Sequence, residues 1–137
     1  MEMAHGYFEH DADIGIIGRG NTVEESFVSA AHAMFAIQSE LESVLSIEGI
    51  QIDFEEDDLE LALVRWLNAL LAASRERGIV LREFGVEREG DRWRGWARGE
   101  RWRDALVRGT EVKGATLTML SVSHEAGGWE ARCVVDV

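Results

Sequence analysis

Hydrophobic residues recur at two different spacings along this chain, and the spacing predicts where helices and strands lie. The first helical pattern begins at Thr22 and Glu25, whose three-residue separation is that of an N-terminal capping box. Apolar residues then follow at helical spacing, at Phe27, Ala30, Ala31 and Met34. We therefore expect a helix over residues 23–37.

A second helical pattern follows the acidic run EEDD at residues 55–58. Negative charges favour the positive end of the helix dipole, and Asp57 with Glu60 repeats the capping spacing. A continuous apolar stripe extends from there to Gly78, a residue type that commonly ends helices, and consists of Leu59, Leu63, Trp66, Leu67, Leu70 and Leu71. We expect this to be the core helix, with Trp66 and Leu67 buried.

The remaining apolar segments are short, and several alternate with polar residues, which is typical of strands. A first strand is expected over residues 7–17, before the turn-forming segment GRGNT, and another within residues 47–54. The sequences EGD, ARGE and EAGG resemble hairpin breaks. They separate four further expected strands, over residues 80–88, 92–98, 115–123 and 129–137.

Together these elements predict an α+β fold in which two main helices pack on a mostly antiparallel β-sheet. The chain has 137 residues, of which 46% are hydrophobic, so we expect a single domain over residues 1–137 with an ordinary core. We also expect the N- and C-terminal strands to be neighbours in the sheet.

Charge is unevenly distributed along the chain, which carries a net charge of −12. Residues 1–64 hold 15 of the 26 acids and a single base, Arg19, whereas residues 65–137 hold 11 acids and 13 bases. Such an acidic half repels a phosphate backbone, so we expect no tight direct binding of nucleic acid. Divalent cations and basic protein surfaces are better-matched partners.

Neither a signal peptide nor a membrane-spanning segment is evident in the sequence. The expected protein is therefore soluble and cytoplasmic, with no membrane partner, and its oligomeric state is left open. The single cysteine, Cys133, excludes an internal disulfide and a multi-cysteine zinc site, and its apolar surroundings in RCVVDV indicate a small buried hydrophobe.

Acidic residues near both ends of the chain are the first candidates for chemistry. The segment FEHDADIG places His10, Asp11 and Asp13 in an apolar strand, where Asp11 and Asp13 share one face and His10 points to the other. In the last strand, Asp136 lies on the opposite face from the apolar residues. If the terminal strands are adjacent, Asp13 and Asp136 converge with an oxygen of Val137.

Two neighbouring carboxylates raise each other's pKa unless a cation neutralises them. A site made of hard oxygen ligands suits Ca²⁺, Mg²⁺ or Mn²⁺ better than Zn²⁺. The alternative is that the aspartates lie on a solvated face, that His10 is an ordinary core or edge histidine, and that the chain end frays.

Lys113 is the only lysine and precedes a β-branched run. It can hold a phosphate, contact a carboxylate of a partner, neutralise the acidic cluster, or be an ordinary solvated lysine. The chain contains no Walker loop and no HExxH, GxSxG or CxxC motif. Nucleotide hydrolysis, zinc proteolysis and serine-hydrolase chemistry therefore lack their usual sequence support.

Four ordered segments resemble the archease family. YFEHDADIGIIGRGNTVEESFVSAA is similar to the family's His-Thr-Ala-Asp-Ile-Gly segment with its glycine turn and helix start, and LVRWLNALLAAS to its middle helix. EVKGATLTML is similar to the Lys-Ala-Val-Thr-Tyr-His segment, and ARCVVDV to the Val-Val-Asp-Ile ending. The chain departs from the pattern at Asp11, where the family usually has threonine, and at Leu117 and Thr118, which replace the Tyr-His pair.

Archeases are protein cofactors of the RtcB-type RNA ligase, which joins RNA ends in tRNA splicing and RNA repair after its own histidine is guanylylated. The resemblance implies a non-enzymatic activator that promotes metal-dependent guanylylation and multiple turnover of such a ligase. It implies a divalent-metal site at Asp13 and Asp136, with Val137 as an oxygen donor and Ca²⁺ as the first candidate ion before Mg²⁺ or Mn²⁺. Three further residues are candidate supporting groups: His10, Asp11 and Lys113.

Two other functions remain open on the sequence. One is a stand-alone metal-dependent hydrolase that uses Asp13 and Asp136 as ligands and His10 as acid or base. The other is a metal-free, chaperone-like module for an RNA-modifying enzyme, which the resemblance to the archease family also allows.

Overall fold

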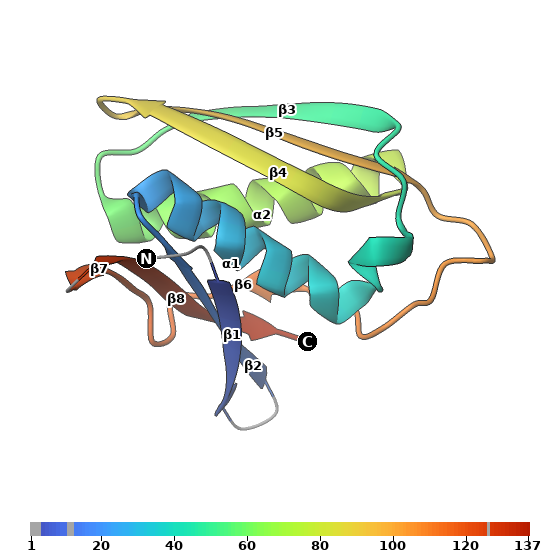
Figure 1. The fold of residues 1–137 in the computed structure, drawn as a ribbon, viewed down its shortest axis with the longest axis horizontal. Coiled ribbons are helices and arrows are strands. Elements are labelled where there is room, and N and C mark those ends of the chain that lie inside the picture. The colour runs from blue at the N-terminus through green and yellow to red at the C-terminus, as the bar shows by residue number, and fades with distance from the viewer. Residues whose placement is uncertain (1–3, 11–12, 126) are drawn as a thin grey trace.

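Two antiparallel β-sheets enclose a layer of two helices in the computed structural model, which describes residues 4–10, 13–125 and 127–137 (Figure 1). The five-stranded sheet has the order β1, β2, β8, β6, and β7 also pairs with β8; its strands are β1 (Ala4–His10), β2 (Asp13–Gly20), β6 (Gly114–Ala115), β7 (Ser121–Glu125) and β8 (Gly128–Asp136). The three-stranded sheet has the order β3, β5, β4; its strands are β3 (Glu48–Glu55), β4 (Ile79–Glu89) and β5 (Arg92–Arg101).

The helices are α1 (Val23–Gln38) and α2 (Leu59–Arg77), and a single 3₁₀ turn, η1 (Leu41–Ser43), follows α1. The predicted cap of α1 is confirmed, because the backbone N–H of Glu25 donates to Thr22 Oγ1 at 3.1 Å. The capping residue of α2 lies one position later than predicted. It is Asp58, not Asp57, whose side chain accepts the N–H of Leu61 at 3.0 Å. It ends at Gly78, which has the left-handed φ of +65° that favours glycine.

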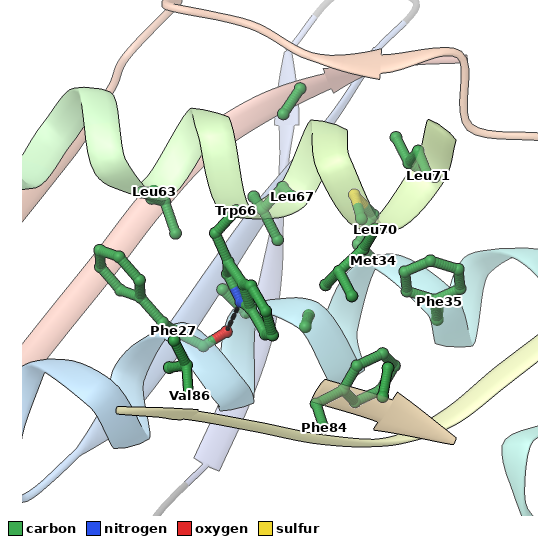
Figure 2. Close-up of a cluster of buried hydrophobic side chains, with 14 of the residues drawn as sticks. Phe27, Met34, Phe35, Leu63, Trp66, Leu67, Leu70, Leu71, Phe84 and Val86 are labelled. Atoms are coloured by element: carbon green, nitrogen blue, oxygen red, sulfur yellow. Dashed lines mark hydrogen bonds between the residues drawn. The ribbon is translucent and has the colours of Figure 1, made fainter. Parts of the chain in front are cut away.

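The core lies between the two sheets and is formed by both helices together with the inner strand residues. Trp66 and Leu67 are fully buried, as predicted. The indole N–H of Trp66 donates to the carbonyl oxygen of Phe27 at 3.0 Å, which joins α2 to α1 and satisfies the one polar group of the indole (Figure 2). The predicted α+β class with helices on antiparallel strands is therefore confirmed, with the strands divided between two sheets.

The expectation of one strand over residues 7–17 is wrong. The chain forms two antiparallel strands there, β1 and β2, in which His10 is the Cα partner of Asp13. Asp11 lies outside the described residues, so its expected place on one face with Asp13 is not tested by the structure. Because the direction of the chain reverses between His10 and Asp13, the reading of His10 from a continuous strand no longer holds.

The expected strand over residues 115–123 is also interrupted. Thr116 instead folds onto β8, where its backbone N–H and its hydroxyl both donate to the carbonyl oxygen of Val134, at 3.0 and 2.8 Å. The N–H of Val134 in turn donates to the carbonyl oxygen of Thr118 at 3.1 Å. Met119 then adopts a φ of +51°, outside the range of a strand.

The C-terminal strand β8 lies beside β2, and β1 forms the sheet edge on the other side of β2. The adjacency of the terminal strands is therefore confirmed for the strand that carries Asp13. Within the described part of the chain, no helix is long and apolar enough to cross a membrane.

Candidate metal site at the end of the five-stranded sheet

Asp13 and Asp136 lie at the adjoining ends of two paired strands. Strand β2 begins at Asp13 and β8 ends at Asp136, and the last Cα pair of their antiparallel ladder is Ile14 with Val135. One further step along the same register would set Asp13 opposite Asp136. The strand pairing thus places two acids that are 123 positions apart in the sequence at adjoining strand ends.

Both aspartates occupy the outer face of the sheet, away from the helices. Ile14 and Val135 pack into the core, and side chains alternate between the faces of a strand. The residues that follow Val135 and precede Ile14 must therefore point outward. Asp136 is exposed and Asp13 is half-buried, so an ion bound at this position would be open to solvent or to a partner.

The far side of Asp136 is held by the segment 112–115. The N–H of Lys113 donates to the carbonyl oxygen of Asp136 at 2.7 Å, and Gly114 is the Cα partner of Asp136. The side chain of Lys113 is exposed. Lys113 therefore adjoins the acid pair through its backbone, next to the strand that carries Asp136.

Two residues of α2 fix that segment in place, and the sequence reasoning did not single out either of them. Asn68 Oδ1 accepts the N–H of Ala115 at 2.8 Å, and Asn68 Nδ2 donates to the carbonyl oxygen of Ala115 at 3.2 Å. Arg75 donates to the carbonyl oxygens of Val112 and, at 2.9 Å, of Lys113. The signal for Asn68 is a polar amide within the apolar stripe of a core helix, which requires hydrogen-bond partners.

The remaining candidate residues contribute less to the described site. The side chain of Val137 packs against the core, so only its main-chain oxygen is a candidate ligand. His10 pairs with Asp13 through the backbone, and Asp11 lies outside the described residues. Among the residues that the structure describes, no group of three or more His, Cys, Asp or Glu side chains is arranged to hold a metal ion.

The donor chemistry at this strand end fits a hard divalent cation. Two carboxylates and a main-chain oxygen are ligands of the type that Ca²⁺, Mg²⁺ and Mn²⁺ prefer. Calcium takes about six to eight oxygens, so three protein donors leave several positions for water or for oxygens of a partner. The exposed position of Asp136 is consistent with such an open coordination sphere.

Two clefts of several hundred Å³ lie away from this strand end. One of about 530 Å³ is lined by His5, His32 and Arg82 beside α1, and another of about 450 Å³ by Arg75 and Trp102 beside the end of α2. Enzyme active sites are typically concave, whereas Asp13 and Asp136 lie at open strand ends. Burial raises the pKa of Cys133 to about 12, which makes its thiol a neutral core group and agrees with the sequence prediction.

Comparisons with known proteins agree with one another. The sequence profile of the archease protein family matches residues 5–137. A protein archease of Methanosarcina mazei is 36% identical over 137 residues, covering 96% of this chain and 94% of its own length. A protein archease of Sulfolobus acidocaldarius is 32% identical over 134 residues, with 96% of both chains covered.

A solved structure is similar over nearly the whole fold. The solution structure of protein 1598 of Methanobacterium thermoautotrophicum superposes with a TM-score of 0.84 at 28% sequence identity. The superposition covers 98% of this chain and 99% of that protein. The arrangement of two sheets around two helices is therefore shared with a solved structure.

Proposed function

This chain belongs to the archease family, and we propose that it is a non-enzymatic protein cofactor of an RtcB-type RNA ligase. In this proposal it serves tRNA splicing and RNA repair in the cytoplasm by promoting metal-dependent guanylylation of the ligase and its multiple turnover. The proposal is supported by the family and by one observation in particular, the β2–β8 register, whose last pair, Ile14 with Val135, directly adjoins Asp13 and Asp136.

Asp13, Asp136 and a main-chain oxygen of Val137 would hold the divalent ion, with Ca²⁺, Mg²⁺ or Mn²⁺ as candidates. When bound, the ion supplies positive charge that can balance phosphate oxygens during guanylylation. The residues of this chain would bind the ion and orient the two strand ends around it. Asn68 and Arg75 fix the segment 112–115 against β8. This holds the end of β8 in a position where Asp136 and Asp13 would bind the same ion.

The exposed end of the sheet supports presentation to a partner. Several coordination positions remain for groups outside this chain, and the exposed Lys113 adjoins the acid pair. The lysine can contact a carboxylate of the ligase or orient it. Leu117 and Thr118, which depart from the family pattern, follow in the segment that folds onto Val134.

The test is a titration of purified protein into ligase, GTP and divalent metal, following the covalent nucleotide adduct. Asp13→Ala and Asp136→Ala should each abolish stimulation while leaving the fold intact. The double variant should be no worse than either single one, because both residues serve one site. Asp53→Ala, which removes an exposed acid from the other sheet, is the matched control and should stimulate normally.

Lys113→Ala is expected to behave differently, since a weakened contact can be offset by more protein. Partial recovery of stimulation at high concentration would support a role in partner contact. Full stimulation by a folded double aspartate variant would overturn the metal site and favour the metal-free, chaperone-like alternative. Hydrolytic turnover by the protein alone would instead favour the stand-alone hydrolase.

A further inference from the structure

The outer face of the three-stranded sheet carries an ordered pattern of charge that the proposed ligase cofactor role does not use. Its central strand, β5, presents exposed side chains at every second position: Arg92, Arg94, Trp96 and Arg98. The neighbouring strand β4 presents acids and one glycine at the matching positions: Glu89, Glu87, Gly85 and Glu83.

The register joins these residues into rows across the two strands. Arg92 is the Cα partner of Glu89, Arg94 of Glu87, Trp96 of Gly85 and Arg98 of Glu83. On the other side of β5, the strand β3 repeats the pattern less completely, with Glu55 opposite Arg92 and Asp53 opposite Arg94 but with Gln51 and Gly49 in the other two rows. A basic stripe therefore runs between two acidic ones.

Few of the charges on this face form side-chain ion pairs within the chain, although the hydroxyl of Ser46 donates to Glu83 at 2.6 Å and Arg98 donates to the carbonyl oxygen of Ser46 at 3.3 Å. Gln51 also donates to Asp53, at 3.4 Å. Of the side-chain ion pairs between described residues, the one within these rows joins Arg92 to Glu55 at 4.0 Å. Arg94, at the middle of the stripe, has none within that distance. Helices α1 and α2 cover only the inner face of the sheet, and the outer face is open (Figure 1).

Trp96 gives the face an apolar centre. Its side chain is 44% exposed, although large aromatic residues are usually buried. The indole leans towards β4 and lies over Gly85, where a Cβ atom would come within 2.2 Å of the indole nitrogen. An exposed tryptophan surrounded by charged residues has the composition of an interaction hot spot with its polar rim.

We propose that this face binds a second copy of the chain in an isologous dimer, with the two-fold axis parallel to the strands and between β5 and β4. In that arrangement β5 of each copy lies over β4 of the other. Because the axis is parallel to the strands, each residue has the same position along the strand direction in both copies. Each arginine then faces the glutamate of its own row on the second copy, Arg94 facing Glu87, and both Trp96 indoles meet near the axis. Aligned sheets pack face to face in this way, about 10 Å apart.

The charge pattern selects a second copy over other occupants. A nucleic acid would meet three arginines but also five carboxylates, which repel its phosphates. The chain itself offers a surface with the same spacing and the opposite sign in every charged row, which is what an isologous interface requires. An axis on the β3 side would match only two charged rows.

The contact is expected to be weak. Two strands, β5 and β4, lie under the second copy; at about 4.8 Å apart and about eight residues long they cover roughly 250 Å² per copy, about a third of what a standard stable interface buries on each partner. Dimerisation should therefore appear at high protein concentration and weaken with added salt, because its charge pairs are exposed.

The experiment is sedimentation equilibrium of the full chain over a concentration series, with Arg94→Glu and Glu87→Arg studied separately and mixed. Each variant alone places like charges opposite one another twice across the axis, so self-association should fall by about tenfold or more. In the mixture, the introduced glutamate of one variant faces the introduced arginine of the other, and the unaltered Glu87 faces the unaltered Arg94. The equimolar mixture should therefore regain association that neither variant shows alone.

Intramolecular effects cannot imitate that result, since mixing leaves the cross-strand neighbours inside each chain unchanged. Asp53→Arg is the matched control: it makes the same charge change opposite the same Arg94 but on the β3 side, and should still dimerise. Trp96→Ala should weaken the dimer. Concentration-independent monomer, a dimer that survives Arg94→Glu, or a mixture that stays monomeric would overturn the proposal, as would binding of single-stranded RNA by this face without dimerisation.

Discussion

The outer faces of the two sheets use cross-strand charge in opposite ways. On the three-stranded sheet, every charged row sets an arginine opposite an acid. At the end of the five-stranded sheet, the pair Ile14 with Val135 is the last of its ladder, and one further step along that register would set two like charges, Asp13 and Asp136, opposite one another. Opposite charges stabilise a strand pair and like charges directly opposite destabilise it. The first pattern therefore stabilises its own strand pair, whereas the second does not, and it is the position where we propose that a cation binds.

Both sheets pack on the same hydrophobic core, so we expect substitutions in the core to change the free energy of unfolding most. Leu67→Ala should lower the free energy of unfolding by about 2 to 5 kcal/mol, because Leu67 is fully buried in the helix layer. Leu61→Ala, in the same helix at a side chain that is 42% exposed, should change it by less than about 0.5 kcal/mol. Chemical denaturation of both variants measures the difference, and similar values would show that the stripe of α2 is misplaced.

A smaller effect that is confined to the five-stranded sheet is expected at Gly18. A Cβ atom there would lie 2.3 Å from Ser26 O and Ala30 N of α1, and neither backbone atom can move without shifting the helix. Gly18→Ala should cost roughly 1 to 3 kcal/mol, as overpacking does. Gly6→Ala is the control, because a Cβ at Gly6 meets nothing within 4 Å. Equal stability of the two variants in denaturant would contradict the close packing of α1 on β2.

How far the sequence could predict this fold depends on the range of the interactions involved. The helices were predictable because caps such as Thr22 with Glu25 and the stripe around Trp66 are local patterns. The reversal between His10 and Asp13 was not, because the intervening Asp-Ala lacks the glycine or asparagine of common two-residue turns. The run EEDD contains two adjacent aspartates, Asp57 and Asp58, and the sequence does not distinguish which of them caps α2.

The candidate site was predictable only in part. Alternation indicated that Asp136 points away from the apolar residues of its strand, and the structure agrees. Alternation does not reveal which strands pair, so the division into two sheets and the roles of Asn68 and Arg75 required the fold. Whether Asp13 and Asp136 bind metal stays a prediction.

The flank between the two sheets should respond to pH through His32. Its ring packs edge-on against Phe84 of β4, at 5.1 Å between centroids. Burial lowers the pKa of His32 below its ordinary value of 6.5, His5 and Arg82 lower it further, and Glu83 opposes them. The neutral ring therefore stabilises the fold above pH 6.5, and this contribution is lost as the pH falls through the lowered pKa.

His32→Gln removes that titration. Between pH 7 and 5, the free energy of unfolding of the wild type should fall more steeply than that of the variant, by less than one proton's contribution per pH unit. Denaturant titrations at stepped pH values measure both slopes. Parallel pH profiles would show that His32 titrates equally in the folded and unfolded states.

The smallest change in stability is expected at the acid pair, and there its sign is informative. With a chelator present, Asp136→Asn removes the repulsion from Asp13 and should raise the free energy of unfolding by about 0.2 to 1 kcal/mol. Asp53→Asn, whose cross-strand partner is Arg94, removes an attraction and should lower it by a similar amount. The same chemical change on the two sheets should thus have opposite effects.

Calcium should then reverse the order at the five-stranded sheet. A ligand that binds only the folded state stabilises it in proportion to the logarithm of its concentration over its dissociation constant, about 2.7 kcal/mol at a hundredfold excess. The wild type and Asp53→Asn should gain that stabilisation as Ca²⁺ is added, whereas Asp136→Asn should gain little because one of its two carboxylates is gone. If Asp136→Asn destabilises the chelated protein, or responds to Ca²⁺ as the wild type does, then the like-charged pair is not what holds a cation at this strand end.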